Sequence, residues 1–122
     1  MTDALNLTLQ HASGPLAVAT VTGAIDLHTA PTLRCEALQL ISRGHRNLIL
    51  DMSRTGFCDS SGLNALIGIW HGAQGAGGSL ALAAVPYPLM RMLTLTGLDD
   101  LLPVHPTTAD ALAAYAEHPD PT

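Results

Sequence analysis

Apolar and polar positions along the chain follow two periods, and the shorter one predicts strands. Residues 5–9 carry leucine at every second position, which is typical of a half-buried strand. Residues 47–52 contain a continuous run, Leu48-Ile49-Leu50, which suits a central strand covered on both faces. Further strands are predicted at 16–22, at 79–85 and at 101–104, the last at an edge because Pro103 cannot donate to a ladder.

Between these segments, apolar residues recur at spacings of three and four, which predicts four helices. Proline is tolerated in a first helical turn and glycine commonly follows a last one, so Pro31 and Gly44 mark two of the ends. The glycine-rich stretch 72–78 is interpreted as a helix stop and turn, because it lacks the Lys-Ser/Thr ending of a phosphate-binding loop. The predicted helices run from Thr29 to Gly44, Ser60 to Gly72, Pro86 to Gly97 and Thr107 to Ala116.

Strands that alternate with helices predict an α/β fold. A length of 122 residues indicates a single domain over residues 1–122, and the tail at 118–122 is expected to fray. Hydrophobic residues make up 48% of the chain and aromatic residues only 3%, so we expect a globular core built from leucine, alanine, valine and isoleucine.

Charge and composition exclude several classes of function. The net charge is −5 and the five basic residues form no cluster, which argues against binding to nucleic acid or to an anionic membrane surface. No apolar run is long enough to span a bilayer and the first residues do not resemble a signal peptide, so we expect a cytoplasmic protein. The scattered histidines and the two cysteines predict neither a metal site, a cofactor nor a disulfide.

The stretch 57–63 joins the central strand to the second predicted helix and places Asp59, Ser60 and Ser61 at the helix start. One interpretation is a simple N-cap, because a short side-chain oxygen accepts from free backbone N–H groups. A nucleophilic serine is disfavoured, since the Gly-x-Ser-x-Gly pattern is absent and no spacing supplies a base, so no catalytic residue is predicted. The third interpretation is phosphorylation, whose added charge would meet free N–H groups and would be felt by a docked partner.

Asp59-Ser60-Ser61-Gly62-Leu63 after a strand resembles the signature of the STAS domain, the fold of bacterial anti-sigma factor antagonists. Residues 22–30, with Gly23 and Asp26, resemble the family's Gly-x-(Leu/Ile)-Asp segment, which leads from a strand into the first helix. The match covers roughly residues 5–114. It implies a single STAS domain with a mixed sheet of four to five strands and about four helices, mainly on one face.

In that family the serine after the aspartate is the phosphoacceptor, which corresponds to Ser60. The resemblance implies a non-enzymatic antagonist that binds an ATP-using anti-sigma factor kinase and so releases the sigma factor. Phosphorylation switches the binding off, and a phosphoserine phosphatase resets it. The implied partner-binding residues are Asp26, Asp59, Ser60, Ser61 and Gly62. Asp26 is equally interpreted as a cap of the first helix, and Ser61 as a capping or buried hydroxyl.

Other interpretations stay open at this point. A STAS domain can also serve as a non-phosphorylated assembly subunit of a transporter or signalling scaffold, and an enzyme is the third hypothesis. Ala24 replaces a residue that is often charged in relatives, which bears on which kinase is recognised. Met90, Met92 and Leu95 make the third helix apolar on more than one side; they are interpreted as core, with a partner-facing or self-association patch as the alternative.

Overall fold

The apolar runs at residues 16–22 and 47–52 form neighbouring strands, and helices pack against them. The structure, a computed structural model, describes residues 5–117, so the predicted frayed tail at 118–122 lies outside the described residues. Its elements are β1 (Asn6–Ser13), β2 (Leu16–Ile25), α1 (Ala30–Ser42), β3 (Asn47–Cys58), α2 (Ser60–Gly75), β4 (Ser79–Ala83), α3 (Tyr87–Thr96), a 3₁₀ turn (Leu98–Asp100), β5 (Val104–His105) and α4 (Thr108–Glu117).

The five strands form one sheet in the order β1-β2-β3-β4-β5. β1 pairs with β2 in the antiparallel sense, and the three remaining pairs are parallel. The sheet is therefore mixed, as predicted. Because β2 and β3 are parallel neighbours, their carboxyl ends lie at the same end of the sheet, where the turns into α1 and α2 begin.

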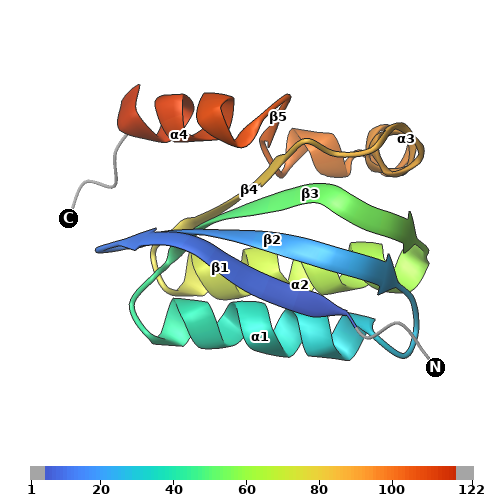
Figure 1. The fold of residues 1–122 in the computed structure, drawn as a ribbon, viewed down its shortest axis with the longest axis horizontal. Coiled ribbons are helices and arrows are strands. Elements are labelled where there is room, and N and C mark those ends of the chain that lie inside the picture. Colours follow the sequence, from blue (N-terminus) through green and yellow to red (C-terminus); the bar gives the residue numbers. More distant parts are fainter. Residues whose placement is uncertain (1–4, 118–122) are drawn as a thin grey trace.

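Helices cover both faces of this sheet, unequally (Figure 1). α1 and α2 run side by side against one face, and the main core lies between them and the strands. The buried leucines of α3, Leu89 and Leu93, belong to the same core. α4 packs against the opposite face, where Ala111 joins a smaller cluster with Val18 and Ile49. The helices thus lie mainly on one face, and the fold class is confirmed.

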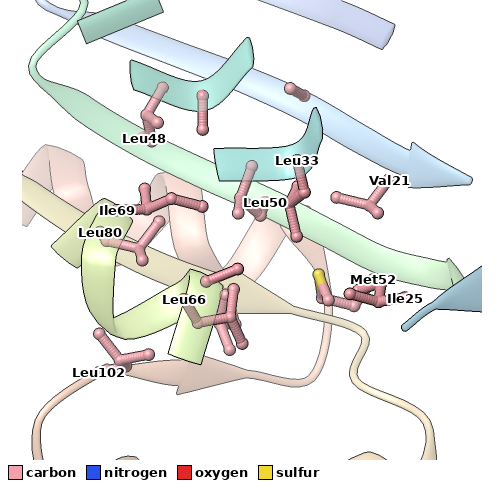
Figure 2. Close-up of a cluster of buried hydrophobic side chains, with 14 of the residues drawn as sticks. Val21, Ile25, Leu33, Leu48, Leu50, Met52, Leu66, Ile69, Leu80 and Leu102 are labelled. Carbon is pink, nitrogen blue, oxygen red and sulfur yellow. The ribbon is translucent and has the colours of Figure 1, made fainter. Parts of the chain in front are cut away.

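The main core is aliphatic, as the composition predicted. Alternate residues of the central strands point into it, and Figure 2 shows their side chains facing those of α1 and α2. Leu50 and Met52 of β3 and Leu66 and Ile69 of α2 are completely buried. Met90 and Met92 are half-buried against this core, which agrees with their interpretation as core residues. Leu95 is 76% exposed, so its interpretation as a core residue is wrong.

Several strand boundaries differ from the prediction. β1 continues to Ser13, so residues 11–13, predicted as part of a turn, lie in a strand. β2 continues to Ile25 and β3 to Cys58, beyond the ends expected from apolar patterning. In the extra parts, exposed or half-buried residues outnumber the buried Ile25, Thr55 and Cys58, and the register between β2 and β3 is irregular. Both features hide the period of two. β5 is only Val104–His105, because Pro103 precedes the ladder instead of joining it.

The helix ends follow the predicted signals closely. Thr29 is the N-cap residue of α1, and Pro31 lies in its first turn. Gly97 ends α3 in the left-handed conformation, with φ of 78°, which favours glycine. The Thr107 hydroxyl accepts a hydrogen bond from the Asp110 N–H at 3.0 Å and so caps the start of α4. These ends fix where the loops lie around the sheet.

Candidate functional site

The turn between β3 and α2 is held by the side chain of Asp59. Asp59 is the N-cap residue of α2, in extended backbone conformation, and its carboxylate accepts a hydrogen bond from the Ser61 N–H at 2.8 Å. Its carbonyl oxygen accepts from the N–H groups of Gly62 and Leu63 at 3.0 and 3.4 Å. The capping interpretation of Asp59 is confirmed, and three N–H groups of the first turn already have acceptors.

Ser60 is the first residue of α2, and its side chain is exposed. Within the described part of the chain, its hydroxyl makes no hydrogen bond. Ser61, one residue further, is half-buried and lines a groove of about 260 Å³ between α1 and α2. Of the two neighbouring hydroxyls, that of Ser60 is therefore the one presented to solvent at the tip of the turn.

Gly62 is buried beneath this turn, and its contacts explain why a glycine is needed. A Cβ atom at this position would run into the Cys58 sulfur and would lie 2.8 Å from the Ile25 Cγ2 atom. Such a contact is far closer than the packed atoms of a protein interior tolerate. Gly62 thus allows α2 to begin directly on the ends of β2 and β3. Its contact with a partner stays a prediction.

Asp26 organises the neighbouring turn, between β2 and α1. Its carboxylate accepts hydrogen bonds from the N–H groups of His28 at 2.8 Å and Thr29 at 3.0 Å. The Thr29 hydroxyl in turn donates to the Ala24 carbonyl at 2.8 Å and accepts from the Asp26 N–H at 2.9 Å. The Thr29 N–H, followed by that of His28, holds the pKa of Asp26 below its usual range, since both stabilise the carboxylate. Asp26 therefore stabilises the turn that precedes α1.

The two turns are joined directly. The Asp59 N–H donates to the Ile25 carbonyl at 3.1 Å, and Ile25 is paired with Cys58 at the end of the ladder. The fold thereby brings the predicted residues of both motifs to one end of the sheet. Asp59 caps α2, and Ser60 follows it as an exposed residue. The Asp26 carboxylate instead accepts from N–H groups that precede α1, whose N-cap residue is Thr29, so its interpretation as a cap of the first helix is wrong.

Two exposed apolar side chains in these segments were not among the predicted site residues. Leu27, in the turn before α1, is 71% exposed and borders the same groove as Ser61. Phe57, near the end of β3, is 58% exposed. The sequence could have indicated both residues, because each is a large apolar residue next to turn residues and outside the predicted apolar pattern of a helix or strand. Each of the two motif segments therefore carries one exposed apolar side chain.

Cys58 lies under the turn and behaves as a small hydrophobic residue, as predicted. It is buried in the main core. Burial raises the pKa of its thiol to about 11, and the nearby Asp59 carboxylate adds to the rise. A thiol with so high a pKa is protonated at neutral pH and is a poor nucleophile.

A family model described as the STAS domain matches residues 6–111. The chain belongs to the STAS domain family. Among curated STAS relatives, the anti-sigma F factor antagonist of Paenibacillus polymyxa is 29% identical over 109 residues, which cover 88% of this chain and 92% of the relative. The anti-sigma-B factor antagonist of Bacillus subtilis is 31% identical over 84 residues, which cover 69% of this chain and 76% of the relative.

Solved STAS structures agree in fold. The crystal structure of an anti-sigma factor antagonist from Mycobacterium paratuberculosis has a TM-score of 0.80 and 28% identity, covering 93% of this chain and 97% of that one. The structure of SpoIIAA from Bacillus in the phosphorylated form has a TM-score of 0.70, covering 89% and 98% of the two chains; at 19% identity this likeness concerns the fold alone.

None of the helices in residues 5–117 has the length and apolar character needed to cross a membrane. Across the same residues, no cluster of three or more histidine, cysteine, aspartate or glutamate side chains is placed to hold a metal ion.

Proposed function

We propose that this STAS domain is a cytoplasmic anti-sigma factor antagonist and that Ser60 is its phosphoacceptor. In the unmodified state it binds an anti-sigma factor with serine kinase activity and so frees the sigma factor. ATP-dependent phosphorylation of Ser60 ends that binding, and a phosphoserine phosphatase restores it. The domain acts as a binding module and not as an enzyme. Two curated relatives with the names of anti-sigma factor antagonists support this class of function.

The observation that carries the proposal is the placement of Ser60. Its side chain is exposed, it makes no hydrogen bond within the described residues, and it stands on a turn fixed by the Asp59 cap. A kinase needs an accessible hydroxyl on a segment of defined shape, because it must hold that hydroxyl in line with the transferred phosphoryl group. Half-buried Ser61 fits this requirement less well.

The local hydrogen bonds suggest how a phosphate would act. The simple expectation was that the phosphate would bind free N–H groups of the helix start. However, the N–H groups of Ser61, Gly62 and Leu63 are already hydrogen-bonded to Asp59. A phosphate on Ser60 therefore projects outward and stands beside the Asp59 carboxylate, which adds like charge. The fold keeps its own bonds, while the turn gains about two negative charges three residues after the exposed Phe57.

The first test is the intact mass of the protein recovered from its own host, before and after phosphatase treatment, followed by peptide mapping. We expect one phosphate on the peptide that contains Ser60. Ser60→Ala should abolish it, whereas Ser61→Ala should retain it. Phosphate incorporation into Ser60→Ala at the wild-type level would refute the site.

The second test separates folding from switching. Ser60→Ala should keep the wild-type thermal midpoint and keep binding to the co-purifying kinase, whereas Ser60→Asp should keep the fold and bind more weakly. Ser53→Asp places the same charge on an exposed serine of β3 and serves as the control. Equal affinities of Ser60→Asp and Ser53→Asp would contradict an interface centred on the turn.

A further inference from the structure

A second groove lies beside the turn, between the end of β3 and the start of α3. Its volume is about 320 Å³. Thr55 and Phe57 line it from β3, and Pro86, Pro88 and Met92 line it from the α3 side. Its walls are mainly carbon, and its volume lies at the lower end of the range for small-molecule sites, which combine apolar walls with few polar groups.

One residue that lines this groove carries a buried hydroxyl without a partner. Thr55 is 7% exposed, and its Oγ1 atom is buried with no hydrogen-bond partner in the described residues. Thr55 is paired with Gly23 of β2, which offers no side chain that could reach it. A buried hydroxyl left without a partner typically costs about 1–3 kcal/mol, so most such groups in proteins are satisfied. A group that enters the groove and bonds to this oxygen would recover that cost.

We propose that this groove binds a compact aromatic molecule that carries one hydroxyl, a ligand of the phenol class. The ring would lie among Phe57, Pro86 and Pro88, and its hydroxyl would exchange a hydrogen bond with Thr55 Oγ1. The oxygen is covered in this structure, and the half-buried Met92 is the lining side chain best able to move aside, because methionine has flexible torsions and a thioether that favours contact with ring edges.

This groove is distinct from the turn between β3 and α2 that carries Ser60, but it adjoins that turn along the chain. Phe57 and Cys58 line the groove, and Asp59 and Ser60 follow them directly along the chain. Ser61 lines the other groove, between α1 and α2. The proposal stands on Thr55 and the groove walls alone and holds whether or not Ser60 is phosphorylated.

The test is a titration of the whole protein, labelled with ¹³C at the methionine methyl groups, with phenol and with toluene. Toluene has the same shape and lacks the hydroxyl. We expect saturable phenol-dependent shifts at Met92, with those of Met52, buried in the core, unchanged. Phenol should bind about tenfold more tightly than toluene, the factor that one hydrogen bond of ordinary strength provides. No saturable shift at Met92, or equal binding of both compounds, would overturn the proposal.

Variants of Thr55 sharpen the result. Thr55→Val keeps the shape and removes the hydroxyl, so it should raise the thermal midpoint and yet lose the preference for phenol. Thr55→Ser keeps the hydroxyl and should keep the preference, which guards against a folding defect in the first variant. Thr94→Val, on an exposed position of α3, is the matched control and should bind phenol as wild type does. A Thr55→Val protein that still prefers phenol tenfold would overturn the assignment of the hydroxyl.

Discussion

Replacing Gly62 with alanine tests whether the turn between β3 and α2, which carries Ser60, depends on direct contact between α2 and the strands beneath it. The new Cβ would collide with the Cys58 sulfur and would lie 2.8 Å from Ile25 Cγ2, and both neighbours are buried in the core. Overpacking of this kind costs about 1–3 kcal/mol. Alanine also favours helix over glycine by up to about 1 kcal/mol, which offsets part of the cost.

We therefore expect Gly62→Ala to lower the free energy of unfolding by about 1–2 kcal/mol, with a fall in thermal midpoint of about 5 °C for a domain of this size. Gly75→Ala is the matched control, because it makes the same chemical change in the same helix and a Cβ there meets nothing within 4 Å. That variant should be as stable as wild type or slightly more stable. Urea denaturation of both variants measures the difference.

A double-mutant cycle identifies the contact. If the collision with the sulfur matters, Cys58→Ala should remove much of the penalty of Gly62→Ala, so that the two changes together cost less than their sum. A Gly62→Ala protein as stable as Gly75→Ala, or strictly additive effects of Gly62→Ala and Cys58→Ala, would refute the reasoning. The first result would mean that the helix start moves aside without cost, and the second that the cost does not come from the contact with the Cys58 sulfur.

Three further predictions concern the same end of the sheet. Asp59→Ala should lower stability by about 1 kcal/mol, the usual value of an N-cap, and Asp59→Asn should lose less because it keeps an acceptor for the Ser61 N–H; equal losses in urea denaturation would argue against the cap. At about pH 8 a thiol reagent should label the exposed Cys35 and leave the buried Cys58 unlabelled until denaturant is added, because the pKa of Cys58 is about 11. Equal labelling rates of the two cysteines in the folded protein would contradict this prediction. The pKa of Asp26 is lowered in the folded protein, so its carboxylate contributes to stability above the ordinary pKa, and this contribution is lost as pH falls through the lower, folded value. The thermal midpoint of Asp26→Asn should therefore decline less steeply in acid than that of wild type. Parallel curves of thermal midpoint below about pH 5 would count against this prediction.

The sequence predicted the order of elements well because each boundary carries its own local chemistry. Pro31, Gly97 and Thr107 mark helix ends through a first-turn proline, a left-handed glycine and a hydroxyl cap, and these signals do not depend on distant residues. The ends of β2 and β3 were missed for the opposite reason. Their last residues pair irregularly at the rim of the sheet, so their conformation depends on a neighbour that the local pattern does not reveal.

The candidate site was likewise predictable only in part. The motif residues Asp26, Asp59 and Ser60 were identified from the sequence, and the fold brings them to one end of the sheet. The bond from the Asp59 N–H to the Ile25 carbonyl joins positions far apart in the chain, and no local pattern encodes it. The burial of the unpartnered Thr55 hydroxyl could not be predicted for the same reason, since a threonine near a strand end is normally expected to be exposed to solvent.

The glycines of α2 have a consequence for how the domain folds. Gly68 and Gly72 let the helix approach Arg34 and Leu38 of α1, as Gly62 lets it approach the strands. Each glycine weakens an isolated helix by about 1 kcal/mol relative to alanine. The segment that carries Ser60 is therefore a poor helix by itself and depends on α1 and the sheet to form. Its amide protons should exchange with solvent only when α1 also opens, so the two helices constitute one cooperative unit.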